Sequence, residues 1–343
     1  MMQTLQNRYR LKTLIPLLAV IIFACCVPLF AGNEALTLII PALLWGVACM
    51  GWTSIVKTGQ FSMGQAGFMA IGAYASTLSM LNLGVPFGLN LLFGGIVSGV
   101  IALLMGMAVL RLGGLYFAIV TLAFGELVRV LAINARNITN GVYGLIVPQP
   151  EIIIGGHMIA FAVSKAAYYY LSLGLVIIAA LIFWRLDASR LGRISRSISS
   201  SPQLSQHLGI HLMKYRVLAF TVASALSGVA GGLYSHYLVF MGPTVFVLSH
   251  SIMILIMSTV GGIGSAVAGP IIGAMVLSPL GDYLRTVLMG GRPLVFGTIV
   301  IIIIFFLSGG LVSIPERIRS WREGGGRAGN VELENAIRNL SSK

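Results

Sequence analysis

The stretch Ala35–Val56 reads ALTLIIPALLWGVACMGWTSIV, which is 22 residues without a charged side chain, between Glu34 and Lys57. A helix rises about 1.5 Å per residue, so about 20 apolar residues are enough to cross the ~30 Å hydrocarbon core of a bilayer. This stretch therefore predicts a transmembrane helix.

The rest of the chain has the same character. Of its 343 residues, 57% are hydrophobic, only 9% are charged and 42 are glycine, and the mean hydropathy is +0.95. A soluble domain has about 25% charged residues. The composition excludes a soluble enzyme, a disulfide-stapled secreted domain and a disordered chain, and it indicates an all-α polytopic membrane protein in which small glycines let helices approach closely.

Apolar segments of membrane-spanning length recur along the chain and predict about ten transmembrane helices. The first follows the basic residues Arg8, Arg10 and Lys12 like a signal peptide, but its length and the lack of a small residue before the potential cleavage site favour a retained helix. The third, eighth and ninth segments are rich in glycine and are candidates for broken or re-entrant helices. The ten segments are 13–31, 35–56, 62–82, 87–110, 114–133, 166–184, 217–240, 246–263, 266–284 and 293–312.

The basic residues predict the orientation. The loops on one side of this layout carry 17 of the 22 lysines and arginines, and the excess marks the cytoplasmic side. Both termini are then cytoplasmic, and the net charge of +13 belongs to these loops and the lipid surface rather than to nucleic acid. The predicted organisation is a cytoplasmic N-terminus 1–12, a transmembrane domain 13–312 with an outer loop 134–165 and a cytoplasmic loop 185–216, and a cytoplasmic tail 313–343.

After Asp187 near its start, the loop 185–216 has no acidic residue to balance its arginines, because none occurs between Asp187 and Asp282. Ser199–Pro202 predicts a helix start, with serine as the cap and proline in the first turn, and Gly209 predicts its end. Such a short surface helix fits two roles equally well: an anchor at anionic lipid headgroups or a docking helix for a cytoplasmic partner.

Five stretches resemble, in order, the permeases of branched-chain amino acid ABC importers. The resemblance covers roughly residues 35 to 315, is closest to the second, M-type permease subunit, and favours the docking role for the loop. The stretches are Thr58–Tyr74 (TGQFSMGQAGFMAIGAY), Gly114–Glu126 (GLYFAIVTLAFGE), Leu191–Lys214, Gly261–Ser265 with Gly269 and Pro270, and Ser308–Val312.

The resemblance implies a bacterial or archaeal cytoplasmic-membrane importer with four kinds of component. These are this chain, a second permease subunit, two cytoplasmic ATP-binding subunits and a periplasmic substrate-binding protein, with branched-chain or related amino acids, amides, urea or aromatic acids as substrates. None of the five lysines follows a glycine, so the sequence contains no phosphate-binding loop. We therefore expect no catalytic residue and no cofactor in this chain.

The resemblance also carries over the coupling role of the cytoplasmic loop. This loop has serine and glutamine where the family usually has acidic residues, so we expect its contact with the ATPase to depend on shape and hydrogen bonds. The coupling residues carried over are Arg196, Ser199, Ser200, Pro202, Leu208, Gly209 and Ile210.

Polar residues within the predicted spans are candidates for the translocation path. Glu126 and Arg129 lie on one helix face, where a structural ion pair is favoured over a substrate contact. A proton-coupled secondary transporter that uses Glu126 is the alternative function, and a passive channel has no motif behind it. Gln60, Ser62 and Gln65 begin a glycine-rich segment, where they fit either a carboxylate site at a helix N-terminus or interhelical hydrogen bonds.

No metal site is expected. Cys25, Cys26 and Cys49 lie in apolar runs. His207 and His211 have the i, i+4 spacing of metal ligands but no third ligand nearby, so they fit an ordinary surface helix better.

Overall fold

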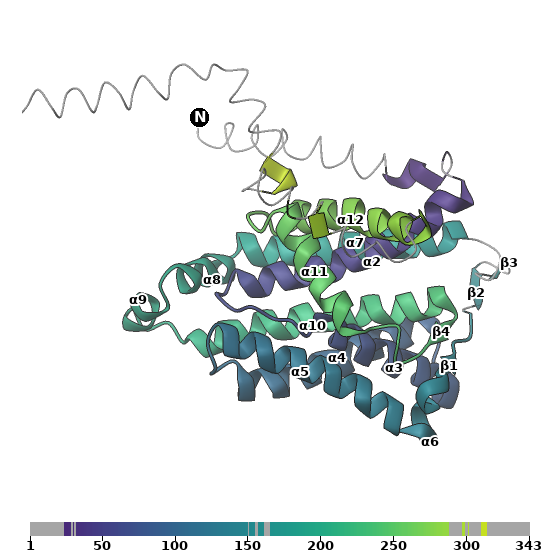
Figure 1. Cartoon of the computed structure of the whole chain (residues 1–343), viewed down its shortest axis with the longest axis horizontal. Helices are drawn as coiled ribbons and strands as arrows, with labels where there is room; N and C mark the ends of the chain where they lie inside the picture. Colours follow the sequence, from purple (N-terminus) through teal and green to yellow (C-terminus); the bar gives the residue numbers. More distant parts are fainter. Residues whose placement is uncertain are drawn as a thin grey trace, which may run out of the picture.

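The computed structural model describes residues 24–28, 30, 32–149, 151–154, 157–160, 165–287, 297–298, 301 and 310–313. The predicted first and tenth spans lie mostly outside these residues, as do the N-terminal segment 1–12 and the tail beyond residue 313. The described part is a bundle of helices with a few short strands (Figure 1).

Six helices of the described part are long and apolar enough to cross a membrane, and they match the second to seventh predicted segments to within a few residues at most of their ends. The two differences larger than that are the later end of α7 and the earlier start of α10. The six helices are α2 (Asn33–Val56), α3 (Gln65–Leu83), α4 (Phe87–Val109), α5 (Leu115–Asn134), α7 (Lys165–Ala188) and α10 (Leu212–Leu238).

Helix α10 lies at the centre of the bundle and packs against α2, α3 and α4. Glycines permit this packing. A Cβ atom on Gly72 of α3 would overlap the backbone of Gly228 of α10, and one on Gly231 would overlap the backbone of Met69. The high glycine content therefore serves close backbone approach, as expected where lipid gives no hydrophobic drive between helices.

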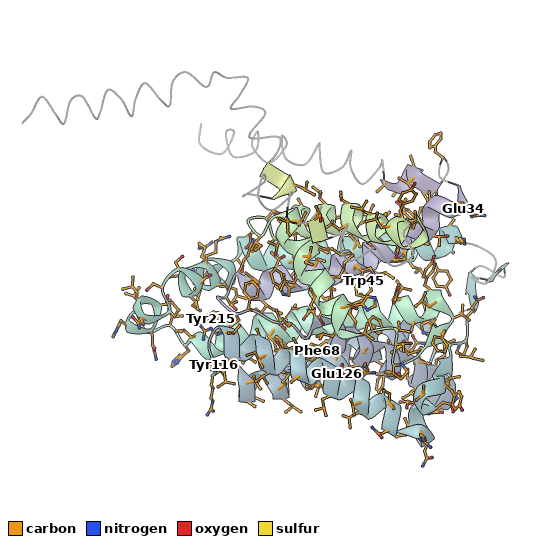
Figure 2. All side chains as sticks on the ribbon, in the orientation of Figure 1. Glu34, Trp45, Phe68, Tyr116, Glu126 and Tyr215 are labelled. Atoms are coloured by element: carbon orange, nitrogen blue, oxygen red, sulfur yellow. The ribbon has the colours of Figure 1, made fainter. Side chains whose placement is uncertain are left out.

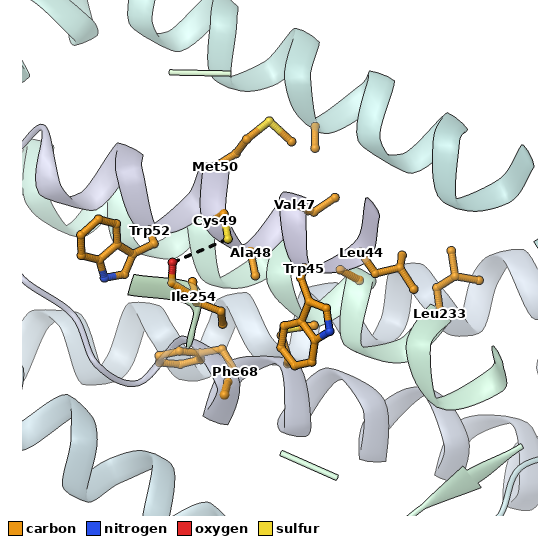
Figure 3. Packing of buried hydrophobic residues seen from close by; sticks show 14 of the residues in the cluster. Leu44, Trp45, Val47, Ala48, Cys49, Met50, Trp52, Phe68, Leu233 and Ile254 are labelled. Atoms are coloured by element: carbon orange, nitrogen blue, oxygen red, sulfur yellow. Dashed lines mark hydrogen bonds between the residues drawn. The ribbon is translucent and has the colours of Figure 1, made fainter. Parts of the chain in front are cut away.

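Helix α2 is buried around most of its circumference, as expected for a helix that is apolar on every side. Figure 3 shows the core around it: Trp45, Cys49 and Trp52 point from α2 toward neighbouring helices, and the Cys49 thiol donates a hydrogen bond to the Ile254 carbonyl at 3.6 Å. Helix α2 also packs along α7 and α12. Among the six membrane-length helices of the described part, α2 is the most deeply buried.

The glycine-rich eighth and ninth segments form α11 (Leu248–Gly261) and α12 (Ala268–Val287). With 14 residues, α11 is only about 21 Å long and is too short to span the bilayer as a regular helix. A Cβ atom on Gly261 would overlap the carbonyl of Gly269, so the two helices form a close hairpin. The eighth predicted segment thus forms a helix shorter than a regular span, followed by a turn into α12.

The predicted outer loop, 134–165, contains short elements and no membrane-length helix within its described residues. Helix α6 (Arg136–Thr139) and the 3-10 turn η1 (Gly141–Tyr143) lead to β1 (Leu145–Ile146), which pairs with β4 (Phe240–Met241). A second strand pair, β2 (Glu151–Ile154) with β3 (His157–Ala160), follows. Figure 1 places these elements at the end of the bundle opposite to α8 and α9.

Candidate coupling and translocation site

The predicted cytoplasmic loop folds into two helices, α8 (Arg190–Ser200) and α9 (Pro202–His207). The start of α9 is as predicted: Ser201 is the N-cap, its hydroxyl accepts a hydrogen bond from Leu204 N at 3.4 Å, and Pro202 is the first residue. The preceding helix, α8, was not predicted from the sequence. Its own N-cap is Ser189, whose hydroxyl accepts from Leu191 N at 3.1 Å.

The end of α9 also agrees with the sequence. Gly209 has φ of +79°, the left-handed conformation that glycine adopts at little cost. Two backbone hydrogen bonds close the turn, from Gly209 N to the Gln206 carbonyl at 3.0 Å and from Ile210 N to the Ser205 carbonyl at 3.1 Å. The chain therefore turns sharply from α9 toward α10.

Helices α8 and α9 pack against each other as a hairpin. Ile198 and Ser205 are buried, and the hydroxyls of Ser197 and Ser205 lie 3.2 Å apart. On its outer side the hairpin exposes Leu204 (60%) and Leu208 (71%). An exposed apolar tip on a hairpin is suited to packing against another protein surface.

The residues expected to couple to the ATPase all belong to this hairpin or its exit. Arg196 is exposed but does not point freely outward, because its guanidinium donates to the Asp187 carboxylate at 3.1 Å. Ile210 is half-buried. The other five, Ser199, Ser200, Pro202, Leu208 and Gly209, are exposed.

The chain between α2 and α3 re-enters the bundle without helical structure. Thr58, Gln60 and Ser62 are buried, and the Trp52 indole donates a hydrogen bond to the Ser62 carbonyl at 2.8 Å. Irregular backbone is tolerated at membrane depth only where protein covers it and satisfies its polar groups. Helix α3 thus begins at Gln65, three residues after the predicted start of the third span.

Neighbouring helices bind the polar groups at the start of α3. Thr121 Oγ1 accepts from Met63 N at 2.9 Å, and Ser251 Oγ accepts from Ala66 N at 3.2 Å. Gln65 Nε2 donates to Ser227 Oγ at 2.9 Å. These contacts favour the interhelical role of this region over a carboxylate site.

Gln60 and Ser62 likewise have partners within the chain. With its amide oriented so that oxygen faces the guanidinium, Gln60 accepts from Arg216 Nε at 3.2 Å and Nη1 at 3.0 Å. Ser62 Oγ accepts a hydrogen bond from Gly64 N at 3.4 Å.

Glu126 and Arg129 form the expected i, i+3 ion pair on α5. Arg129 Nε donates to Glu126 Oε1 at 2.8 Å, and Nη2 contacts the same oxygen. Their side chains are 41% and 31% exposed, respectively. In Figure 2, Glu126 lies partway along α5, away from the end of the bundle marked by Tyr116 and Tyr215.

A small hollow adjoins this pair. Its walls come from the start of α3, the middle of α5 and the start of α11, and include Ala66, Gly67, Glu126, Leu248 and Ser251. Helix α5 lies on the outside of the bundle and approaches α3 through glycines, since a Cβ atom on Gly67 would lie 2.8 Å from Gly125 Cα. The described residues contain no group of three histidine, cysteine or acidic side chains that could hold a metal ion.

A glycine-packed bundle that contains six helices long and apolar enough to cross a membrane, with a helical hairpin at one end, is typical of a polytopic membrane protein. The family model described as "Branched-chain amino acid transport system / permease component" matches residues 35–310, and the chain belongs to this family. Members of the family are non-catalytic transport subunits, so the expectation that this chain is not an enzyme is confirmed.

Three relatives are similar to this chain over most of its length. The high-affinity branched-chain amino acid transport system permease proteins LivM of Salmonella typhimurium and Escherichia coli are each 29% identical over 272 residues, which are 74% of this chain and 64% of the relative. The match thus spans somewhat less than two thirds of their length. The guanosine ABC transporter permease protein NupQ of Bacillus subtilis is 25% identical over 227 residues, 59% of this chain and 68% of the relative. No solved structure matches the chain significantly.

Proposed function

We propose that this chain is the M-type permease subunit of an ATP-driven importer for branched-chain or related amino acids. It pairs with a second permease chain to form the membrane pathway, two cytoplasmic ATP-binding subunits power it, and a periplasmic binding protein delivers the substrate. The family match and the two LivM relatives support this assignment. One relative is named a guanosine permease, so similarity to the family alone does not fix the substrate, and the substrate class needs its own measurement.

The proposed topology has about ten spans with both termini, the tail 313–343 and the hairpin α8–α9 in the cytoplasm. Basic residues at one end of the bundle support this orientation. They lie at or just beyond the ends of α2, α4 and α7 and in the first turn of α10: Lys57, Arg111, Arg185 and Lys214. The hairpin α8–α9 connects α7 to α10 at this same end (Figure 1). Positive residues at one end of a bundle are typical of the cytoplasmic side.

The hairpin is the observation that carries the proposal. A permease without a phosphate-binding loop must receive motion from its ATPase through a direct contact, and α8–α9 offers one with Leu204 and Leu208 exposed at its tip. Hydrophobic side chains at the centre of a contact with a polar rim are typical of protein interfaces. The exposed Ser199 and Ser200 and the half-buried Ser201 fit that rim.

The translocation path is proposed to run along the exposed face of α5. A charged pair facing lipid at this depth would be costly, whereas one that borders a water-filled path or a second protein chain is tolerated. Glu126 and Arg129 are partly exposed beside the hollow between α3, α5 and α11, which supports a position at the path or at the contact with the second permease. Two nitrogens of the Arg129 guanidinium, Nε and Nη2, donate to Glu126, so the pair is already neutralised, which disfavours a proton relay.

Uptake into proteoliposomes containing the four kinds of component tests the function. Import should require ATP inside and persist when an uncoupler collapses the proton gradient at constant ATP. Loss of import under the uncoupler would instead favour the proton-coupled transporter.

Glu126→Gln should lower the yield of folded protein more than the uptake per molecule, since it removes an ion pair that orders α5. Competition by leucine, guanosine, amides and aromatic acids identifies the substrate.

A further inference from the structure

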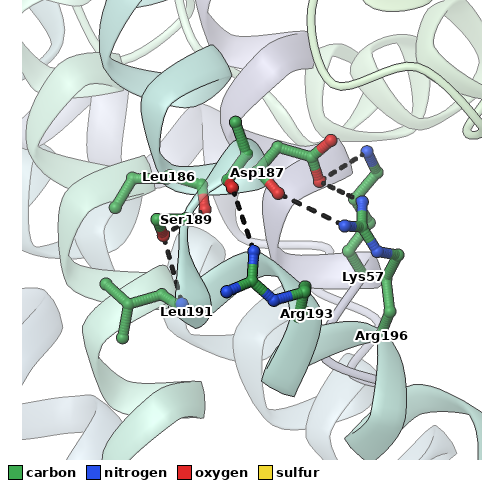
Figure 4. A network of polar contacts seen from close by, with 8 residues as sticks. Lys57, Leu186, Asp187, Ser189, Leu191, Arg193 and Arg196 are labelled. Atoms are coloured by element: carbon green, nitrogen blue, oxygen red, sulfur yellow. Dashed lines mark hydrogen bonds and ion pairs between the residues drawn. The ribbon is translucent and has the colours of Figure 1, made fainter. Parts of the chain in front are cut away.

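Asp187 is the single acidic residue between Glu151 and Asp282 in the sequence, and it stands where α7 ends and the hairpin α8–α9 begins. Its Oδ1 atom accepts hydrogen bonds from Lys57 Nζ at 3.0 Å and from Arg196 Nη1 at 3.1 Å (Figure 4). Its backbone carbonyl accepts a further bond from Arg196 Nη2 at 3.4 Å. One carboxylate oxygen thus connects the end of α2, the end of α7 and the middle of α8.

The three side chains of this contact differ in their exposure to water. The side chain of Lys57 is 11% exposed and that of Asp187 26%, whereas that of Arg196 is 51% exposed. A cation as buried as Lys57 needs its partner, because breaking such a pair leaves an uncompensated charge. Lys57 and Arg196 share this one carboxylate. Among the described residues, no other acidic side chain forms an ion pair with either of them.

The backbone around Asp187 is packed to bring α8 close to the spans. A Cβ atom on Gly192 would overlap the Asp187 carbonyl, and one on Gly59 would lie 3.3 Å from Ser199 Cα. Gly59, with φ of +76°, belongs to the segment that follows Lys57. Helix α8 is therefore seated between the end of α7 and the turn after α2.

The turn after α2 leads directly into the candidate path. From Lys57 the chain continues as the re-entrant segment 58–64, in which Thr58, Gln60 and Ser62 are buried and Met63 N donates a hydrogen bond to Thr121 of α5. It then becomes α3, whose first residues line the hollow beside Glu126. The covalent distance from Lys57 to the start of α3 is eight residues. Any movement of α8 that pulls on Lys57 acts on this segment.

We propose that Asp187 is a positioning residue that fixes the hairpin α8–α9 to the end of α2, so that displacement of the hairpin by the ATPase reaches the re-entrant segment 58–64 and α3. The proposal rests on the coupling role given to the hairpin above. In this proposal, the Asp187 carboxylate links the hairpin α8–α9, which contacts the ATPase, to the translocation path beside α3 and α5.

The first experiment measures the link without using transport. In the purified nucleotide-free complex, hydrogen–deuterium exchange over residues 190–208 should become roughly tenfold faster in Asp187→Asn, because the charge-assisted hydrogen bonds that anchor the hairpin are lost. The effect is no larger than this because water partly screens these contacts in the original protein. Asp187→Glu should restore most of the protection. Arg190→Gln is the matched control, since Arg190 is exposed on the same helix and no hydrogen bond of its side chain occurs among the described residues. Unchanged exchange in Asp187→Asn overturns the proposal.

The second experiment measures transmission. In reconstituted complexes, Asp187→Asn should raise the ATP hydrolysed per substrate imported at least threefold, and Arg196→Gln, which removes one of the two links, should have a smaller effect. Lys57→Met combined with Asp187→Asn should be no worse than Asp187→Asn alone, because both remove the same contact. Additive losses, or an unchanged ratio together with faster exchange, overturn transmission through Asp187.

The two experiments separate this inference from the proposed function. If the unmodified complex imports nothing at the expense of ATP, the proposed function fails, and the exchange measurement still decides whether Asp187 anchors the hairpin. If import is ATP-driven and exchange in Asp187→Asn is unchanged, the proposed function stands and the positioning role of Asp187 fails.

Discussion

Replacing Gly209 with valine perturbs the hairpin α8–α9 at one backbone angle. No atom lies within 4 Å of the position that a Cβ would take at Gly209, so valine meets no steric clash with a neighbour, and the whole effect comes from φ of +79°. A residue with a side chain pays about 1–2 kcal/mol in this left-handed conformation, and a β-branched one stands at the upper end. The two capping hydrogen bonds of the turn contribute roughly 1 kcal/mol each and are weakened together with it.

The expected net loss is about 2 kcal/mol in the stability of the turn after α9. Such a loss lowers the ratio of ordered to disordered turn up to about 30-fold. Helix α9 has six residues and can refold its last turn, so Leu208 should lose its fixed position while the spans remain inserted. Gly209→Asn is the matched control, because asparagine adopts the left-handed conformation at far lower cost.

The assay is co-purification of the assembled importer across a salt series, followed by substrate-stimulated ATP hydrolysis. Gly209→Val should reduce stimulated hydrolysis several-fold, and Gly209→Asn should stay near the original level. Assembly should depend only weakly on moderate salt, because apolar Leu204 and Leu208 form the tip and screening acts on exposed charges. Normal stimulated hydrolysis in Gly209→Val would refute the coupling role, and the lipid-anchor interpretation of the loop would replace it.

Three further predictions concern topology and packing. Reporter fusions at Arg193 should report a cytoplasmic location and those after Gln149 a periplasmic one, and a periplasmic signal at Arg193 would overturn the orientation. Trp52→Phe should lower stability by about 1–2 kcal/mol, seen as a lower unfolding temperature in detergent, because it leaves a buried carbonyl of the re-entrant segment unpaired. Gly67→Ala should destabilise the contact of α3 with α5 by about 1–3 kcal/mol, whereas Gly174→Ala, with open space around it, should be neutral in the same measurement.

The sequence predicts the long spans well because their cause is local. A helix in lipid must satisfy its own backbone over about 20 residues, so charge-free runs such as 35–56 and 87–110 mark α2 and α4 closely. The ends of α9 are predicted for the same reason. Ser201 and Gly209 act within their own turns, through a hydroxyl next to a backbone N–H and through a glycine's conformational freedom.

The link through Asp187 could not be predicted, because its partner Lys57 is 130 residues away. The sequence alone shows a loop whose only acid is at its edge and says nothing about which of several basic residues meets it. Helix α8 was missed although its sequence carries a local signal. Leu191, Ile194 and Ile198 recur at helical spacing on one face of a segment that is otherwise rich in arginine and serine, and Ile198 is buried.

The start of α3 shows how tertiary contacts decide between two interpretations that local sequence leaves equal. Free backbone N–H groups at a helix start would attract a carboxylate, but Thr121 and Ser251, which are 58 and 185 residues away from their partners, already accept from Met63 N and Ala66 N. A substrate carboxylate would have to displace these hydroxyls and would gain little by the exchange. Along the described wall of the hollow, the charged group left to face a zwitterionic solute or a second permease chain is therefore Glu126, paired with the neighbouring Arg129 on the helix that the rest of the bundle covers least.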